Sequence, residues 1–504
     1  MKWYWYLVLV FFILMTSVLA FWSGTEHDQI ISEDDNMMGW YTRIAVDSNG
    51  KIHVVWNERI VNYPTQQEIH YSSSTDNGRT WSAMSGDMVI SYNDGVTAEN
   101  GSSIAVNSED ILYVVWSEVD GSSKEIHYSI SEDGGTTWSG RMADHVLSYP
   151  GGNDANNPAM AIDHNDVIHV VWNQTWSSGM AEICYSRSTD GGATWSSQTA
   201  ESIISYPDGA AAFQPDIAVG LNNEIAVVFK ENHDTSNTFN VMNISMSSDG
   251  GLTWNGTTAD HPVCQAIRIA QYPHVEIDPE GNIHVTWQGT QNIVSPFHYE
   301  MFYSRSTDGG STWSGLVSDR IVSYYQTGGG SVSNPNLGMD HCGNLFAVWD
   351  EYYTGTTNEI HISTSTDAGV TWSGETRDEI ISFPDGHPAY RPCLEAGIDD
   401  TLHVTWNEVT TTSYYQIHYS RGDAICIPSV EPVDDLTIQK ISNHAVLNWD
   451  EVPNAIGFKI YRSTDPNFIP TPADSIGYTT SNNYTDTNII INNAVKFYNV
   501  IVVY

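Results

Sequence analysis

The stretch that decides the fold is Ser74-Thr75-Asp76-Asn77-Gly78-Arg79-Thr80-Trp81. Five related octets follow along the chain, with their aspartates at Asp133, Asp190, Asp249, Asp308 and Asp367. The copies are therefore 57 to 59 residues apart, and a fixed period of this size indicates a repeat architecture. Each octet has the chemistry of a turn, because a carboxylate accepts hydrogen bonds from nearby backbone N–H groups and glycine adopts positive φ. We expect the tryptophan of each octet to pack beneath the next strand.

Two further elements recur with the octet. One is Ile52-His53-Val54-Val55-Trp56, and its copies end at Trp116, Trp172, Phe229, Trp287, Trp349 and Trp406. The other is Glu68-Ile69-His70-Tyr71-Ser72, and its copies begin at residues 125, 182, 241, 300, 359 and 416. These β-branched and aromatic runs have the length of strands and are bounded by Gly, Asn and Asp turns. Four strands per repeat of about sixty residues predict a β-propeller.

The last repeat indicates how the ring closes. It has counterparts of the first three strands, but it lacks both the octet and a fourth strand. An isolated fourth-strand sequence, Gln29-Ile30-Ile31-Ser32, precedes the first repeat and matches Glu379-Ile380-Ile381-Ser382. We therefore predict an all-β chain: a seven-bladed β-propeller of four-stranded blades, whose N-terminal strand completes blade seven, followed by a β-sandwich.

The octets resemble the Asp box of the sialidase (BNR-repeat) superfamily, S-x-D-x-G-x-T-W. The resemblance covers residues 28–423 and implies that the six aspartates are structural turn residues, away from the active face: Asp76, Asp133, Asp190, Asp249, Asp308 and Asp367. True sialidases resemble six-bladed wheels, whereas seven units are closer to other Asp-box propellers, including xyloglucan-degrading ones. Residues 430–504 resemble a fibronectin type III domain that lacks its last strand, with Trp449 as the core tryptophan.

The N-terminus resembles an export signal. Lys2 precedes an apolar run, and Ser17-Val18-Leu19-Ala20 is a small-residue cleavage site, so we expect residues 1–20 to be a signal peptide. An uncleaved anchor is the alternative, since the run is nearly long enough to cross a bilayer. We expect a protein that is secreted or at the cell surface, with no membrane insertion after signal cleavage. The five cysteines include no C-x-x-C pair and imply neither a zinc site nor a dense disulfide framework.

The charge of the chain limits its partners. It has 61 acidic against 19 basic residues, a formal net charge of −42. A surface this negative repels polyphosphates and anionic lipids, which argues against nucleic-acid and membrane-surface partners. Many of the acids are repeat positions spread around the wheel, so the charge does not by itself mark one acidic patch. We expect an extracellular glycan or protein ligand, a monomer, and no cofactor or metal, with Ca²⁺ on open-face carboxylates as the alternative.

Candidate catalytic residues come from the face that carries the loops after strands two and four, which is the default binding face. The resemblance implies, for a sialidase, three arginines on a substrate carboxylate, and bidentate guanidinium pairing suits that role. Arg43 and Arg391 are the arginines that enter a first strand from this face. Glutamates recur at one offset after strand two, either as a glycosidase acid/base pair or as exposed repeat residues: Glu58, Glu118, Glu231, Glu351 and Glu408. Asp350-Glu351 is the adjacent acidic pair of this set, so the catalytic candidates are Arg43, Arg391, Asp350 and Glu351.

Aromatic residues supply the ligand-binding candidates. Trp40 and Trp176 have no place in the repeat, so they either stack on a sugar ring or plug a blade edge locally. Tyr41 and Tyr390, beside the two arginines, complete the predicted binding set. The recurring histidines share two strand positions, and cross-strand packing explains them better than metal or general-base chemistry.

The function predicted from these residues is recognition of a carbohydrate or other ligand by a sialidase-like propeller, without demonstrable catalysis. The first alternative is a glycoside hydrolase, either an exo-sialidase or another extracellular glycosidase. The second alternative is a structural scaffold for protein interactions, because propellers carry many unrelated functions.

Overall fold

The computed structural model describes residues 22–25, 28–33, 37–59, 66–143, 145–149, 151–176, 179–198, 202–232, 240–265, 269–290, 298–318, 320–324, 330–352, 357–409, 414–422, 433, 436–441, 444–450, 457–463, 475–479, 481–486 and 497–503. The predicted signal peptide lies outside these residues.

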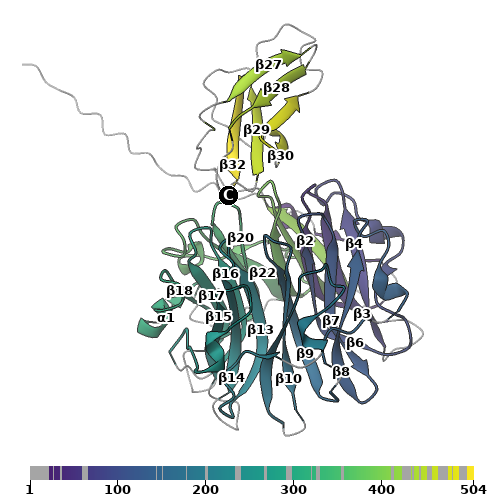
Figure 1. Ribbon diagram of the computed structural model, residues 1–504, viewed down its shortest axis with the longest axis vertical. Helices are drawn as coiled ribbons and strands as arrows, with labels where there is room; N and C mark the ends of the chain where they lie inside the picture. Colours follow the sequence, from purple (N-terminus) through teal and green to yellow (C-terminus); the bar gives the residue numbers. More distant parts are fainter. Residues whose placement is uncertain are drawn as a thin grey trace, which may run out of the picture.

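Up to Gly422, the described residues form seven antiparallel sheets (Figure 1). The first three sheets are β2 (Gly39–Val46), β3 (Ile52–Arg59), β4 (Gln67–Ser74), β5 (Met88–Val89); β6 (Ala98–Val106), β7 (Leu112–Asp120), β8 (Ser123–Ser131); and β9 (Asp154–Ile162), β10 (Ile168–Thr175), β11 (Ala181–Ser188), β12 (Ser202–Ile203). The fourth and fifth are β13 (Ala211–Val219), β14 (Ile225–Asn232), β15 (Asn240–Ser247); and β16 (Ala270–Ile277), β17 (Ile283–Gly289), β18 (Glu300–Ser306), β19 (Arg320–Ile321). The last two are β20 (Ser331–Met339), β21 (Leu345–Tyr352), β22 (Asn358–Ser365), β23 (Glu379–Ile380); and β24 (Ala389–Ala396), β25 (Leu402–Val409), β26 (Tyr415–Gly422), β1 (Gln29–Ile30).

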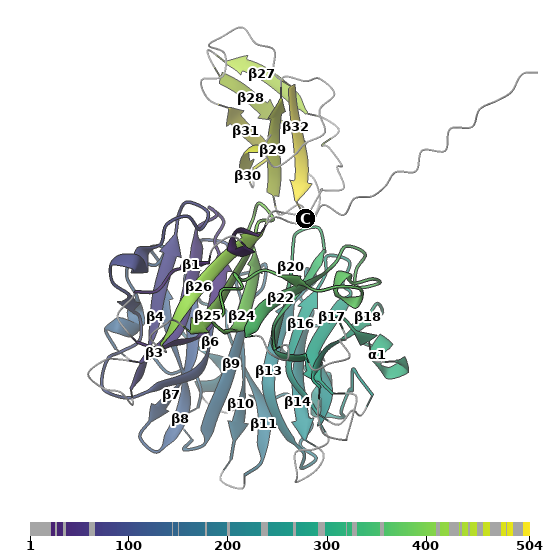
Figure 2. The same ribbon diagram turned by 180° about the vertical axis from the view of Figure 1, so that it is seen from behind.

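The seven sheets close into a ring. Each sheet presents its first strand to the next sheet, so that β2, β6, β9, β13, β16, β20 and β24 contact one another in this order and β24 contacts β2 again. β1 pairs with β26, and the backbone N–H of Ile31 donates to the carbonyl of Ile417 at 2.8 Å. The predicted all-β propeller is thus confirmed, as is the prediction that the N-terminal strand completes the last sheet (Figure 2).

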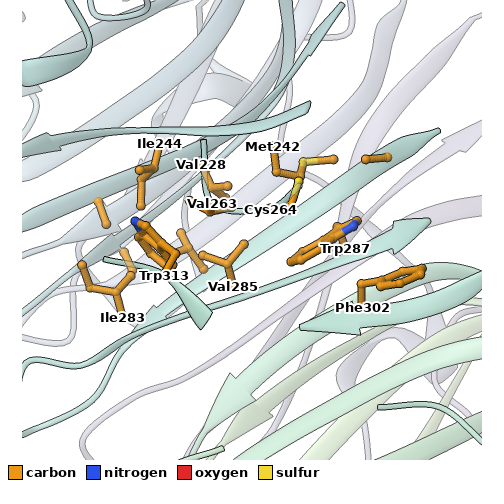
Figure 3. Packing of buried hydrophobic residues seen from close by; sticks show 14 of the residues in the cluster. Val228, Met242, Ile244, Val263, Cys264, Ile283, Val285, Trp287, Phe302 and Trp313 are labelled. Carbon is orange, nitrogen blue, oxygen red and sulfur yellow. The ribbon is translucent and has the colours of Figure 1, made fainter. Parts of the chain in front are cut away.

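Apolar side chains fill the space between neighbouring sheets. The second strand of each sheet is buried along nearly its whole length, and its first five residues are mostly apolar. Figure 3 shows one such layer, in which Trp287 of β17 and Phe302 of β18 stack with ring centroids 5.8 Å apart, and Trp313 packs on the same cluster. Full burial of side chains of this size contributes roughly 1.5–3 kcal/mol each, so these layers hold the ring together.

The octets form the turns that the sequence predicts. In the first, Asp76 Oδ1 accepts the backbone N–H of Thr80 at 2.8 Å, and Asp76 Oδ2 accepts the Thr80 hydroxyl at 2.7 Å. Gly78 has a φ of 76°, and a Cβ there would lie 2.2 Å from the Tyr419 hydroxyl. Trp81 packs edge-on against Tyr419 of the preceding sheet, with centroids 5.0 Å apart. Each octet therefore ties its own sheet to the previous one.

Short helical turns follow the octets: η2 (Ser82–Ser85), η3 (Ser139–Arg141), η4 (Ser196–Gln198), η5 (Asn255–Thr257), α1 (Ser314–Val317) and η6 (Ser373–Glu375), while η1 (Ser23–Thr25) precedes β1. In the described part of the chain, no helix has both the length and the apolar character needed to cross a membrane.

A separate unit follows the propeller. Its strands form two three-stranded sheets, β27 (Thr437–Ile441), β28 (His444–Asn448), β31 (Asn483–Asp486) and β30 (Ser475–Thr479), β29 (Gly457–Ser463), β32 (Phe497–Val503). Leu447, Trp449, Phe458 and Ile460 form its core, and Figure 1 shows the unit projecting from the propeller. Trp449 lies in this core as expected, while the fibronectin type III-like assignment stays a prediction.

Candidate functional site

The innermost strands all carry a bulge at the same place. In β2 the register with β3 shifts between Trp40 and Arg43, and the other six innermost strands shift at the corresponding point. The residue inside the bulge has positive φ: Tyr41 54°, Gly101 101°, Asn157 52°, Gln214 54°, Tyr272 53°, Asn334 47° and Arg391 54°. A non-glycine residue in this region costs about 1–3 kcal/mol unless its surroundings compensate, and such strain clusters at functional sites. We call these seven residues the axial ring.

The axial ring lines a cavity of about 390 Å³ on the axis of the propeller. A second layer, two residues further along each strand, lies below it: Arg43, Ser103, Ala159, Asp216, His274, Asn336 and Cys393. Glu276 and Glu395 lie two residues deeper again. The cavity is therefore built from all seven sheets, and polar side chains occur in each of its layers.

A cation–π contact fixes the most prominent pair in the axial ring. The guanidinium carbon of Arg391 lies 4.4 Å from the centroid of the Tyr41 ring. Tyr272 interacts electrostatically with both residues, and burial raises its pKa. The backbone N–H of Tyr272 also donates to Gln214 Oε1 at 3.1 Å. Three large side chains from sheets one, five and seven thus gather at the same end of the cavity.

Asp350 fixes the positions of Arg391 and Asn334 through hydrogen bonds. Its Oδ1 accepts the backbone N–H of Arg391 at 2.9 Å and the Asn334 amide at 2.8 Å. Its Oδ2 accepts the Asn358 amide at 3.1 Å. The side chain is fully buried and is not among the residues that line the cavity, and burial raises its pKa to about 6 although these hydrogen bonds oppose the rise. Asp350 therefore positions two bulges of the axial ring.

The same brace occurs between other sheets with neutral side chains. Asn57 occupies the position of Asp350 in the first sheet, and its amide donates to the carbonyl of Ala98 at 3.1 Å. Ser117 occupies it in the second sheet and donates to the carbonyl of Ala155 at 2.6 Å. In the first, second and sixth sheets, the residue after the strand-two aromatic thus links its sheet to the first strand of the next.

The strand-two glutamates are not exposed, and the expectation that they are is wrong. Glu351 is 2% exposed, and its Oε2 accepts the indole N–H of Trp349 at 2.8 Å. Glu58, Glu118 and Glu408 accept the equivalent tryptophans at 2.7, 2.6 and 2.9 Å. A buried indole N–H needs an acceptor, and the glutamate two residues later supplies it between the sheets. Glu351 therefore lies in a packing position away from the cavity lining.

Both predicted arginines line the cavity. Arg391 belongs to the axial ring, and Arg43 lies one layer below, where its Nη1 donates to the Thr42 carbonyl at 3.0 Å. They are the arginines of the lining in the part of the chain that the structure describes, so a cluster of three converging guanidiniums is not formed there.

The predicted aromatic residues separate into two groups. Trp40 lies 6.1 Å from Tyr415 between ring centroids, and Tyr390 lies 6.3 Å from the same ring, so both join one aromatic cluster next to the axial ring. Arg59 covers the Trp40 ring at 5.6 Å. Trp176, in contrast, packs against the hydrophobic cluster between sheets two and three. Trp176 is partly buried there, and both interpretations of it, sugar stacking and a plug at a blade edge, stay predictions.

Several cavity residues escaped the sequence-based prediction. Asn157, Gln214, Tyr272 and Asn334 belong to the axial ring, and His274 lies below it. His274 Nδ1 is 3.4 Å from Asp216 Oδ2, and Asp216 also accepts the backbone N–H of Val275 at 2.9 Å. A signal for them existed, because an X-Pro dipeptide recurs at the bulge: Asn157-Pro158, Gln214-Pro215, Tyr272-Pro273, Asn334-Pro335 and Arg391-Pro392.

Glu276 and Glu395 are the deepest carboxyls of the cavity lining, and Glu395 repels the charged form of Glu276. Burial, followed by repulsion from Glu395 and Asp216, raises the pKa of Glu276 well above its usual value. The Glu395 side chain is exposed inside the cavity. The surrounding protein desolvates its carboxyl group and raises its pKa to about 7.

The histidines of the second strands are explained by packing, as expected. His53 Nδ1 lies 2.8 Å from the Tyr71 hydroxyl, and its Nε2 lies 3.2 Å from Asp47 Oδ2. His169 and His284 repeat the first contact with Tyr185 and Tyr303, each at 2.8 Å.

Comparison with known families shows which family the chain belongs to. The family described as "BNR repeat-like domain" matches residues 25–285, just over half of the 504 residues. The chain belongs to the BNR repeat-like family. No curated protein matches the chain.

Several solved structures resemble this BNR-repeat protein in fold. A polysaccharide lyase of family PL25, an ulvan lyase bound to -[GlcA(1-4)Rha3S]-, aligns with a TM-score of 0.53 at 11% identity over 79% of this chain and 95% of that chain. The GH93 α-L-arabinofuranosidase of Fusarium graminearum with arabinobiose aligns with a TM-score of 0.46 at 13% identity over 78% and 96%. A Hadza microbial sialidase aligns with a TM-score of 0.46 at 18% identity over 73% of each chain. At these identities the likeness concerns the fold alone.

Proposed function

We propose that this BNR-repeat propeller is an extracellular recognition protein that binds a carbohydrate at the axial-ring end of its central cavity. The single observation that carries the proposal is the axial ring itself. Six of its seven members are non-glycine residues at positive φ, and the cost of that conformation is explained if their side chains are needed at the axis.

The chemistry of the axial ring suits a sugar. Tyr41 and Tyr272 offer aromatic faces to the apolar side of a pyranose or furanose ring. The amides of Asn157, Gln214 and Asn334 both donate and accept, as hydroxyl-rich ligands require. The cavity volume of about 390 Å³ falls within the range of small-ligand sites, roughly 300–1,000 Å³.

Recognition without catalysis is supported by the positions of the predicted acids. A glycosidase of the usual kind needs two carboxyl groups roughly 5–10 Å apart on either side of the scissile bond. Asp350 is fully buried behind the cavity wall, and Glu351 is committed to the indole of Trp349. Neither carboxyl reaches a ligand in the cavity without rearrangement of the sheets.

An extracellular location is part of the proposal. The signal-like N-terminus supports it, and so does Cys342, which is disulfide-bonded. Disulfides persist in oxidising compartments outside the cytosol.

The experiment is a glycan array probed with the purified chain and with Arg391→Ala. The expected result is binding to a defined set of glycans that Arg391→Ala abolishes. Arg320→Ala is the matched control, because Arg320 lies on the outermost strand of the fifth sheet and pairs with Glu375. A wild-type chain that binds no glycan, or a variant that binds like the wild type, would contradict the proposal.

The second candidate is a carbohydrate-cleaving enzyme, and a different observation favours it. His274 and Asp216 form a titratable pair inside the cavity, with Glu276 one layer below. A panel of fluorogenic glycosides and an assay for unsaturated uronide products test this candidate. Turnover that is lost in His274→Gln and retained in Glu351→Gln would establish it over pure recognition.

A further inference from the structure

A second group of chemistry-bearing side chains lies outside the cavity lining, at the seam where the ring closes. It combines three carboxylates and two imidazoles from four segments: Asp28 before β1, Asp385 and His387 between β23 and β24, Glu408 of β25 and His418 of β26. The potential ligand atoms of Asp28, Glu408 and His418 all lie within 4.8 Å of one another, and so do those of Asp385, His387 and Glu408. Glu408 therefore belongs to both groups.

The His418 imidazole lies too far from the two carboxylates for hydrogen bonds. His418 Nδ1 lies 3.8 Å from Asp28 Oδ2 and 3.7 Å from Glu408 Oε2. Two ligands of one ion, each bound at about 2.0–2.2 Å with an angle of about 110–130°, are separated by roughly 3.4–3.8 Å. The two separations from His418 are therefore those of ligands that share one small metal ion, and Glu408 Oε2 also accepts the indole N–H of Trp406 at 2.9 Å.

Asp28 supplies an independent indication. Its side chain is 6% exposed, and its Oδ1 accepts the backbone N–H of Phe383 at 2.9 Å. Its Oδ2 is buried and accepts no hydrogen bond from the described residues. This oxygen is directed at His418 and Glu408, and a buried carboxylate oxygen without a partner carries a large desolvation cost. The alternative to an ion is a proton shared between the Asp28 and Glu408 carboxyls.

We propose that the seam binds one divalent transition-metal ion of the zinc type through Asp28, Glu408 and His418, with Asp385 and His387 completing the coordination. Mixed nitrogen and carboxylate donors favour such an ion, whereas Ca²⁺ and Mg²⁺ prefer oxygen donors alone. The ion compensates the charge of two buried carboxylates. It also bridges the N-terminal segment to the last sheet, so it stabilises the closed ring.

Equivalent positions elsewhere in the ring serve as internal references. Glu58, His70 and Asp87 form a similar group in the first sheet, and Glu351, His361 and Asp378 form one in the sixth. In the described part of the chain, the seam is the place where two such groups share a ligand. We therefore expect the seam to bind the ion more tightly than the reference groups.

The experiment measures zinc binding by isothermal titration and by elemental analysis of the full chain after treatment with a chelator and dialysis. The proposal predicts one equivalent of zinc at the seam, a higher melting temperature with zinc than without, and little response to Ca²⁺. Glu408→Gln is expected to abolish the zinc-dependent shift, and His387→Ala to weaken binding at least tenfold. His387 is half-exposed on a loop, so its removal leaves the fold intact.

The matched control is His298→Ala, which removes a half-buried loop histidine whose Nδ1 lies 3.3 Å from the Gly330 carbonyl oxygen. This variant should bind zinc like the wild type. Equal zinc affinity in wild type, Glu408→Gln and His387→Ala would mean adventitious binding and overturn the proposal. An unchanged melting temperature in zinc, together with a more stable Asp28→Asn variant, would identify the shared proton instead.

Discussion

The outer turns and the innermost strands of the same sheets follow opposite rules for positive φ. In the Asp boxes the fifth residue is glycine in all six copies, and the aspartate bonds the threonine hydroxyl at 2.6–2.7 Å each time. In the axial ring the backbone conformation is equally constant, but glycine occurs once and the other members are Tyr, Asn, Gln and Arg. The repeat therefore uses glycine at positive φ where only the backbone matters. Where a side chain is needed, it keeps a non-glycine residue in the same strained conformation.

The loss of the closing strand β1 is expected to have the largest effect on the stability of the propeller. Deleting residues 28–33 removes β1, and the whole ring should lose its cooperative thermal transition or melt at a much lower temperature. Ile31→Ala should cost about 2–5 kcal/mol of unfolding free energy, because the side chain is completely buried. Ile30→Ala is the matched control, since Ile30 is 37% exposed. A melt unchanged by the deletion would refute ring closure by β1.

The glycine rule of the outer turns is tested within one Asp box. A Cβ on Gly251 would lie 1.9 Å from the Tyr185 hydroxyl, at a φ of 82°. Gly251→Ala should therefore lower the free energy of unfolding by about 1–3 kcal/mol. Gly250→Ala should cost less, because nothing lies within 4 Å of its Cβ and Ala368 occupies the same place in the sixth box. Denaturant titrations of the two variants make the comparison, and equal costs would contradict it.

The carboxylates of outer turns and sheet interiors should respond to pH in opposite directions. Burial, followed by repulsion from Asp260, raises the pKa of Glu231 to about 8, so the folded state holds a proton that the unfolded state loses. Its contribution to stability is therefore lost as pH rises from about 4.5 to 8. Glu231→Gln should gain stability relative to the wild type over this range in urea titrations.

Asp249 of the same sheet provides the opposite case. Hydrogen bonds from Thr253 lower its pKa to about 2. Its stabilisation is present above the unfolded pKa and is lost as pH falls through about 4 to 2. The destabilisation by Asp249→Asn should thus shrink on acidification, and a cost independent of pH would argue against the assigned hydrogen bonds.

The smallest effect on stability is expected at the axis. Tyr272→Gly removes a side chain from a strained backbone position with a φ of 53°. Because glycine adopts this conformation without steric cost, the variant should be neutral or more stable by up to about 1 kcal/mol. A loss of stability as large as that of Gly251→Ala would show that the Tyr272 side chain serves packing instead.

The repeats made the fold predictable from sequence. The octets, the apolar second strands and the isolated Gln29–Ile30 segment each specify a local structure, and together they specify a closed wheel. Burial was less predictable, because it depends on how neighbouring sheets interlock. Glu351 follows its strand at an offset that suggests exposure, yet it lies between sheets as the acceptor for Trp349.

The site was predictable only where a residue departed visibly from the repeat. Arg43, Tyr41 and Arg391 stood out and do line the cavity. Asp350 stood out as well, but its charge serves the backbone of Arg391. Tyr272 and Gln214 were missed because a β-bulge changes which side chains face the axis, and the alternation of a regular strand does not reveal it.

The most direct test of ligand recognition by the axial ring is the affinity of Tyr272→Gly for a glycan that the wild-type chain binds. The affinity is measured by isothermal titration, together with the melting temperature of the variant. We expect binding at least tenfold weaker than wild type with a melting temperature that is equal or higher. Unchanged affinity, or weaker binding that merely follows a loss of stability, would contradict the claim that the axial ring keeps its strained side chains for ligand recognition.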